Sequence, residues 1–238
     1  MKAKILLTVV ASCLISHSAF AFEGRITAAL TRGGLATRLL YTAGTNCLRV
    51  EVAASDRPYP VDLIDLRSGE LTLLFPNNRT FVDAAAVPQL PATPNPPTAG
   101  GRPAMPAMPA MPPLMMEKTG LAATGDKTNL LGLACEKFQV KQGGQTMDIW
   151  ATAQLVPFQP YVQNQRHHFG PQMIEEKWGG LLAAKKLFPL LASLKFDNGA
   201  EHYRFEVQSI TPERVTPDDA KKLFQPPPGY QELRPLPF

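Results

Sequence analysis

Apolar and polar residues alternate at every second position in several runs between residues 22 and 87 of this 238-residue chain. Between Leu48 and Val52, for example, leucine and valine alternate with arginine and glutamate. Successive side chains of a strand point to opposite faces, so this period is typical of antiparallel sheets with one buried face. Glycine, asparagine and proline separate the alternating runs. Residues 22–87 are therefore predicted to form a meander of about five or six strands, with hairpin tips at 67–69 and 77–79.

Ten prolines at 88–113 break this pattern. The centre of the stretch is a threefold Pro-Ala-Met repeat at 103–111. Each proline removes a backbone hydrogen-bond donor and fixes φ, so the interior of a sheet does not accommodate such a run. We expect residues 88–118 to be an extended linker of the polyproline-II type or a disordered loop, inserted between two halves of one sheet, 22–87 and 119–238.

The repeat places a methionine at every third position. In a polyproline-II helix, Met105, Met108 and Met111 would therefore lie on one side. Clustered thioethers are ligands for Cu(I), which makes a copper site one hypothesis, although no cysteine or histidine flanks the repeat. The alternatives are a plain linker and a docking segment for another protein of the cell envelope.

Alternation resumes beyond the linker. Trp150 is expected in the core rather than in a ligand site, and the turns contain Gly143-Gly144 and Asn198-Gly199, the second a strong hairpin signal. The second half of the chain is predicted to contain four strands, at 133–140, 146–154, 191–196 and 202–210.

Two helices are predicted in the same half. Apolar residues at helical spacing indicate a helix over 172–187, although Gly179-Gly180 weakens its middle. A shorter helix over 217–224 is indicated by Thr216 at the capping position and Pro217 at the first helical position. The inward stripe of the first helix is Ile174, Trp178, Leu181 and Leu182, and the residues expected to face solvent are Glu175, Lys177, Lys185 and Lys186.

The first 21 residues have the composition of an export signal. Two lysines precede an apolar run at 5–15, and Ala19 and Ala21 are the small residues that a leader peptidase requires. The run is shorter than the roughly 20 residues that span a bilayer, so no transmembrane segment is expected in the mature chain. We expect a periplasmic protein beginning near Phe22. The alternative is a lipoprotein acylated at Cys13.

Charge and motifs exclude several classes of function. Removal of the leader leaves 22 basic and 20 acidic residues, a balance that argues against a nucleic-acid partner. Residues 120–128 resemble a phosphate-binding loop, but Asp126 interrupts the motif and no helix follows. The His167-His168 pair is assigned to a surface loop rather than to a metal site. No signature of a hydrolase, zinc protease or thiol oxidoreductase is present, so neither an enzyme nor a cofactor is expected.

Cys47 and Cys135 are the two cysteines that follow the leader. An even pair in an exported protein is most simply a disulfide, because the compartment is oxidising. The bond would close a long loop and stabilise the fold by roughly 4–5 kcal/mol in the chain-entropy model. The alternative is two separate buried thiols.

Four segments together carry a family resemblance: Asn46–Glu51, Leu131–Phe138, Asp148–Ala151 and Leu223–Tyr230. They resemble an uncharacterised family of exported bacterial proteins, a domain of unknown function similar in layout to the LolA/LolB lipoprotein carriers. The resemblance covers most of the chain outside the proline-rich linker. It implies a mainly β, α+β fold, in which an unclosed antiparallel half-barrel has one or two helices across its concave face.

Carriers of that type shelter acyl chains on this concave face, so the resemblance implies, as the leading hypothesis, a carrier of a hydrophobic ligand. Removing apolar surface from water would supply the affinity. The first helix, 172–187, would cover the cavity. The second hypothesis is a structural or adaptor protein acting through the Pro-Ala-Met linker, and the third is Cu(I) binding. The residues expected to line the cavity are Leu48, Val50, Leu71, Leu73, Phe138, Tyr203 and Phe205, each of which is otherwise ordinary core.

Overall fold

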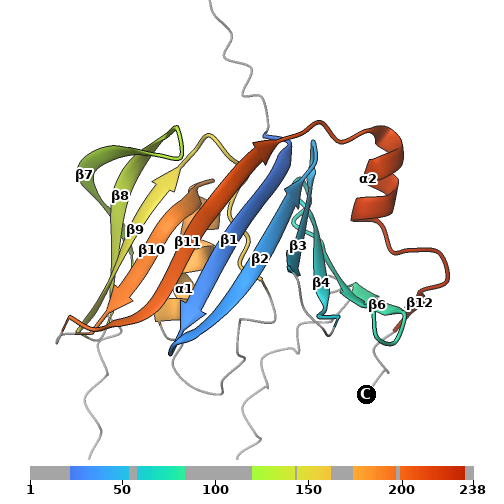
Figure 1. The fold of residues 1–238 in the computed structure, drawn as a ribbon, viewed down its shortest axis with the longest axis horizontal. Helices are drawn as coiled ribbons and strands as arrows, with labels where there is room; N and C mark the ends of the chain where they lie inside the picture. Colours follow the sequence, from blue (N-terminus) through green and yellow to red (C-terminus); the bar gives the residue numbers. More distant parts are fainter. Residues whose placement is uncertain are drawn as a thin grey trace, which may run out of the picture.

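The computed structural model describes residues 22–53, 58–83, 120–142, 144–161, 174–196 and 199–233. Within these ranges the chain forms twelve strands and two helices (Figure 1). In chain order they are β1 (Gly24–Arg32), β2 (Leu35–Ala43), β3 (Cys47–Val52), β4 (Val61–Asp65), β5 (Leu71–Phe75), β6 (Thr80–Asp83), β7 (Leu121–Leu130), β8 (Leu133–Gln142), β9 (Gln145–Thr152), α1 (Ile174–Ala184), β10 (Phe188–Lys195), β11 (Glu201–Pro212), α2 (Pro217–Phe224) and β12 (Gln231–Glu232).

These strands form a single sheet in the order β12-β6-β5-β4-β3-β2-β1-β11-β10-β9-β8-β7. Every neighbouring pair is antiparallel except β12 and β6. β1 pairs with β11 along its whole length, so the two halves of the chain meet in the middle of the sheet. The sheet curves without closing, with β7 and β12 at opposite edges and α1 on its inner side (Figure 1). The predicted unclosed antiparallel half-barrel is confirmed.

The inner face of the sheet is buried because alternate residues of neighbouring strands lie in register there. Ile26 lies opposite Tyr41, and Ala28 lies opposite Leu39, across β1 and β2. None of the four is more than 2% exposed. The residues between them in sequence point to the outer face, as the pleat of a strand requires. The period-two pattern therefore predicted the strands, and in β3 also the buried side, where Leu48 and Val50 are fully buried. It did not give the buried side of β4, in which Asp62 is buried too, or of β5, in which Leu74 is the buried residue.

α1 lies within the predicted helix 172–187, although residues 172 and 173 lie outside the described ranges. Ile174, Trp178 and Leu182 point toward the sheet and are at most 2% exposed. The helix ends where Lys186 adopts a left-handed conformation, with φ of 55°. The amide of Leu187 then donates to the carbonyl of Leu182 at 3.0 Å, which closes the last turn. α1 thus lays one apolar stripe across the inner face.

β7 was not predicted. Residues 120–128 were interpreted as a failed phosphate-binding loop, whereas Leu121–Leu130 pairs with β8 as an edge strand. Eight of its ten residues are exposed, so neither face shows the burial that produces alternation. Its pairing shifts register between Ala123 and Lys127. A bulge and a lysine are both features that discourage an edge strand from pairing with another chain.

The β7–β8 turn contains a leucine in an unfavourable conformation. Leu131 and Gly132 both have positive φ, 50° and 81°, in a two-residue hairpin loop. Such loops favour asparagine followed by glycine, because leucine in the left-handed region is strained by about 1 kcal/mol or more. The Leu131 side chain is 53% exposed and adds little packing.

We expect Leu131→Asn to raise the free energy of unfolding by about 0.5–1 kcal/mol, measured by urea denaturation. Leu131→Ala, which keeps the strain, should not; equal effects of the two substitutions would contradict this explanation.

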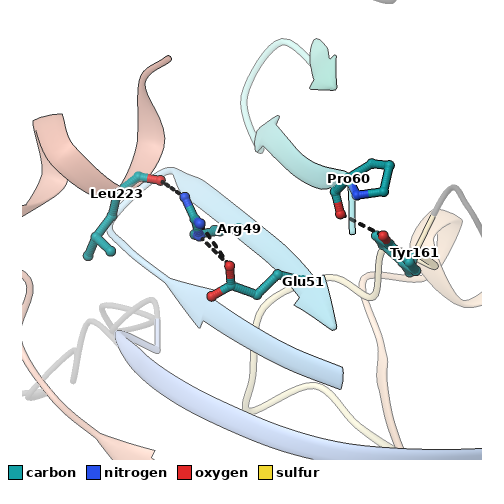
Figure 2. Close-up of polar contacts among 5 residues, drawn as sticks. All are labelled: Arg49, Glu51, Pro60, Tyr161 and Leu223. Carbon is teal, nitrogen blue, oxygen red and sulfur yellow. Dashed lines mark hydrogen bonds and ion pairs between the residues drawn. The ribbon is translucent and has the colours of Figure 1, made fainter. Parts of the chain in front are cut away.

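α2 ties the C-terminal segment to the outer side of the sheet. Thr216 caps it as predicted, because its hydroxyl accepts from the amide of Asp219 at 3.2 Å. At the other end of α2, Arg49 Nη1 of β3 donates to the carbonyl of Leu223 at 3.1 Å (Figure 2). Glu51 holds the same guanidinium at 2.7 Å. Since α2 stands outside the curve, of the two helices only α1 covers the inner face (Figure 1).

Several predicted features lie outside the described residues, and the structure does not test them. They are the leader 1–21 with Cys13, the linker 88–118 with Met105, Met108 and Met111, the His167-His168 pair, and the first two residues of the Asp197-Asn198-Gly199 turn.

Candidate functional site

Six aromatic rings gather between the inner face of the sheet and α1. Ring centroids that neighbour one another are between 4.9 and 6.5 Å apart, mostly in tilted or edge-to-face arrangements. All six side chains are at most 8% exposed. With α1 packed on the sheet, an arrangement that we call the closed structure, the protein's own side chains therefore fill this part of the inner face. The rings belong to Tyr41 of β2, Phe158, Trp178 of α1, Phe188 of β10, and Tyr203 and Phe205 of β11.

Most of the predicted cavity residues belong to the hydrophobic core on the inner face of the sheet. Five of them lie in one buried cluster: Leu48, Val50, Phe138, Tyr203 and Phe205. Leu71 is partly buried against that cluster, and Leu73 is half-buried without joining it. The sequence thus identified the inner face, but these side chains pack together as core in the closed structure.

The segment that follows β9 is the part of this site that sequence reasoning missed. Leu155, Val156, Phe158 and Tyr161 are at most 7% exposed, although the segment has no regular structure. The segment contains two prolines and no periodic pattern, so no element was predicted for it. The Tyr161 hydroxyl donates to the carbonyl of Pro60 at 2.6 Å, which fixes this segment to the start of β4 (Figure 2). Burial, reinforced by the nearby negative charge of Asp62, raises the pKa of Tyr161.

Tyr41 adds a polar atom to the centre of the apolar face. Its side chain is fully buried, and its hydroxyl has no hydrogen-bond partner among the described residues. Burial is the main cause that raises the pKa of Tyr41, and Tyr203 and Asp62 contribute as well. A buried hydroxyl without a partner is destabilising by about 1–3 kcal/mol. The described core is therefore not optimised for stability at this point.

One rim of the sheet carries a buried ion-pair cluster, formed where α1 begins. Glu175 was expected to face solvent, and that prediction is wrong: its side chain is only 3% exposed. Arg32 Nη2 at the end of β1 lies 2.5 Å from Glu175 Oε2, and His202 Nε2 at the start of β11 lies 3.1 Å from Glu175 Oε1. The cluster anchors the first turn of α1 to two central strands. Burial, and then the negative charge of Glu175, raises the pKa of the neighbouring Tyr203.

The same rim exposes apolar side chains. Leu35 follows the β1–β2 turn and is 79% exposed, and Phe196 at the end of β10 is 41% exposed. The two hairpin tips are adjacent, because the amide of Gly33 donates to the carbonyl of His202 at 3.3 Å. The Phe196 ring lies 4.8 Å from the His202 ring, centroid to centroid. Apolar surface thus flanks the ion-pair cluster at this rim.

A pocket of about 250 Å³ lies elsewhere, between α2, the segment 213–215 and the ends of β1 and β2. The charged residues that line it are Arg25, Glu213, Arg214, Asp219 and Lys222. Arg25 pairs with Glu213 at 3.4 Å, and Asp219 accepts from the Thr216 hydroxyl at 2.6 Å. None of the residues that line this pocket belongs to the six-ring cluster or to the ion-pair cluster around Glu175.

The disulfide expected between Cys47 and Cys135 is not formed. Both are free thiols, on β3 and β8. Five strands separate β3 from β8, so the cysteines are about 29 Å apart along the curved sheet, whereas a disulfide requires Cα atoms within about 7 Å. The alternative of two separate thiols describes this structure. Burial is the main cause that raises the pKa of each thiol, which makes both poor nucleophiles at neutral pH.

Because the thiols are free, the stability of the protein is expected to be independent of reductant. The free energy of unfolding, measured by urea denaturation, should be the same with and without dithiothreitol. Cys47→Ser should behave in the same way under both conditions. A decrease of about 4 kcal/mol on reduction would instead indicate a disulfide that closes a long loop.

The described residues include no group of three or more histidine, cysteine, aspartate or glutamate side chains able to hold a metal ion. Of the helices in the described ranges, none is long and apolar enough to cross a membrane. The Cu(I) hypothesis depends on methionines outside these ranges and stays a prediction.

Comparison with other proteins places the chain in a family. A family model described as a domain of unknown function (DUF4412) matches residues 112–230. Comparison with curated proteins gives no match.

Solved structures give distant matches. An uncharacterized conserved protein from Thermus thermophilus is 11% identical with a TM-score of 0.48, over 91% of this chain and 93% of that one. PNGF-II is 14% identical with a TM-score of 0.46; the match covers 91% of this chain but 32% of PNGF-II. MucB in complex with MucA(peri) is 11% identical with a TM-score of 0.38, over 84% of this chain and 54% of that one. The family model spans half of the 238 residues, and the chain therefore belongs to the DUF4412 family, as the sequence resemblance implied.

Proposed function

We propose that this protein is a carrier that binds a long acyl chain on the inner face of its sheet, in the place that α1 occupies in the closed structure. The observation that supports this is an apolar face on an unclosed sheet, covered by a single eleven-residue helix and the irregular segment 155–161. A sheet that closed on itself would need no such cover. The role is binding rather than catalysis.

The attachments of α1 suit a cover that opens. Polar contacts hold its two ends: Glu175 is bound at the rim, and Lys185 just past the helix donates to the carbonyl of Leu121 at 3.3 Å. Between the ends, the buried apolar side chains of α1 pack against the sheet, and the side chains of Trp178 and Tyr203 also interact through a hydrogen bond. Gly179 and Gly180 lower the intrinsic helix stability of the middle.

The energy of opening sets a minimum length for the ligand. Exposing Ile174, Trp178 and Leu182 costs about 1.5–3 kcal/mol each, or about 5–9 kcal/mol in total. A ligand recovers about 0.8 kcal/mol for each methylene that it buries, so about six to eleven methylenes offset the loss. Medium and long acyl chains should bind, and chains as short as hexanoate should not.

Weakening the cover should strengthen ligand binding. Leu182→Ala removes an inward anchor of α1, so the closed state loses about 2–3 kcal/mol that the ligand no longer has to replace. We expect the affinity for palmitate, measured by isothermal titration calorimetry, to rise at least about tenfold. Leu181→Ala is the matched control, because Leu181 is on the same helix but only partly buried. Equal palmitate affinity in Leu182→Ala and the unchanged protein, or no binding of palmitate at all, would contradict the proposal.

We place this role outside the inner membrane, on the strength of the predicted leader at 1–21. The adaptor hypothesis depends on residues 88–118, and no described residue favours it over the carrier.

A further inference from the structure

We propose that Arg32 and His202 form the binding site for the carboxylate of a long-chain fatty acid, and that Glu175 occupies this site while α1 is closed. This inference rests on the proposed carrier function and names its ligand class. Glu175 would then act as an internal substitute for the head of the ligand.

The first support is the composition of the rim. A guanidinium from the end of β1 and an imidazole from the start of β11 converge on the two oxygens of one carboxylate. The carboxylate is nearly buried, whereas Arg32 and His202 remain 36% and 33% exposed and are accessible to solvent beside it. Arginine and histidine at this spacing bind a carboxylate whichever molecule supplies it.

The second support is that Glu175 fits the site imperfectly. Its Oε2 is close to Arg32 Nη2, yet this ion pair lacks hydrogen-bond geometry, and no other described donor reaches the same oxygen. Arginine binds carboxylates best through two parallel N–H groups. The Glu175 carboxylate is tethered to the first turn of α1, whereas the head of a free ligand has no such constraint on its approach to that fork. A ligand carboxylate can therefore replace Glu175 with better geometry.

Charge balance supplies the third support. When α1 leaves the inner face it takes Glu175 with it, and Arg32 then lacks its anionic partner. An acyl chain with an anionic head restores the pair, whereas a neutral chain of the same length does not. The exposed apolar side chains of Leu35 and Phe196 lie at the same rim, where the chain of such a ligand would enter. The site should therefore select fatty acids over uncharged lipids.

Laurate and dodecanol test this selection, because they share a chain length and differ in head charge. We expect the unchanged full-length protein to bind laurate at least about tenfold more tightly than dodecanol. In the double variant Arg32→Gln/Glu175→Gln, which leaves no unpaired carboxylate in the fold, laurate should lose most of that preference while dodecanol affinity stays within about threefold. Glu175→Gln alone should bind laurate more tightly than the unchanged protein, because the competing charge is gone. Arg38→Gln, on an exposed position of β2, is the control that should keep the preference.

Each outcome decides something. A laurate preference that survives in the double variant, or that is equally reduced by Arg38→Gln, overturns the assignment of Arg32 and His202. Equal binding of laurate and dodecanol by the unchanged protein overturns it too, while leaving the carrier function intact. Binding of neither ligand overturns both proposals.

Discussion

Phe205→Ala should lower the free energy of unfolding by about 3–5 kcal/mol, the range for truncating a fully buried aromatic side chain. Phe205 is 1% exposed and lies among four other rings, 5.5 Å from Phe158 and 5.9 Å from Trp178 between centroids. Its removal leaves a cavity that β11 cannot close, because pairing with β1 on one side and β10 on the other fixes its position. Urea denaturation with tryptophan fluorescence measures the change.

Phe196→Ala is the matched control for that substitution. Phe196 belongs to the neighbouring strand, but it is 41% exposed and contacts only one further ring, that of His202, among the described residues. We expect a loss of at most about 1 kcal/mol. Similar losses for the two substitutions would mean that the ring cluster is not the core of this fold.

Gly24→Ala should be the second strongly destabilising change. Gly24 starts β1 with φ of 146°, and a Cβ there would lie 2.2 Å from the carbonyl oxygen of Thr211 and 2.9 Å from the amide nitrogen of Glu213. Both are backbone atoms, so relief requires β1 and β11 to separate where the two halves of the sheet join. Backbone strain and overpacking together predict a loss of about 4 kcal/mol.

Gly33→Ala separates the two contributions. Gly33 also has positive φ, 55°, but nothing lies within 4 Å of a Cβ placed on it. Strain alone predicts a loss of about 1–2 kcal/mol. If thermal and urea unfolding give equal losses for both glycines, the close approach of β1 and β11 at Gly24 does not contribute to stability.

The strands that face both the core and solvent could be predicted from sequence, because their alternation records a physical difference between two faces. Ile26 illustrates this, since it is buried between the exposed Arg25 and the polar Thr27. β7 could not be predicted in this way, because both of its faces are exposed and its sequence carries no record of a buried side. Its pairing with β8 depends on the turn at Leu131-Gly132, which lacks the usual asparagine.

The candidate site was harder to predict because its key contacts depend on distant residues. Glu175 lies three and seven residues before Trp178 and Leu182, so helical spacing places it on the inward stripe. Its charge led to the opposite assignment, and the partners that make burial tolerable, Arg32 and His202, come from two other strands. Phe158 was missed for a related reason: it is buried by tertiary packing against Trp178, 4.9 Å away, and not by any local period.

The glycines of α1 have one effect on the helix itself and another on its packing against a distant segment. The pair Gly179-Gly180 lowers the intrinsic stability of the helix, because glycine has a low helix propensity. In the structure, a Cβ on Gly179 would lie 2.9 Å from Cγ of Pro160, so the missing side chain allows the segment 155–161 to pack against α1. The cover of the inner face is therefore two elements that fit each other, which sequence patterns alone do not show.

Trp178 reports directly on whether α1 leaves the inner face when a ligand binds. The chain has two tryptophans, so Trp150→Phe leaves Trp178, 2% exposed in the closed structure, as the single tryptophan, which can be excited selectively over the tyrosines. Titration of this variant with palmitate should shift its emission to longer wavelength in a saturable manner, because the indole leaves the ring cluster for water. Hexanoate should cause no shift. If the emission stays unchanged up to the highest concentration at which palmitate remains monomeric, α1 is fixed core and the inner face carries no acyl ligand.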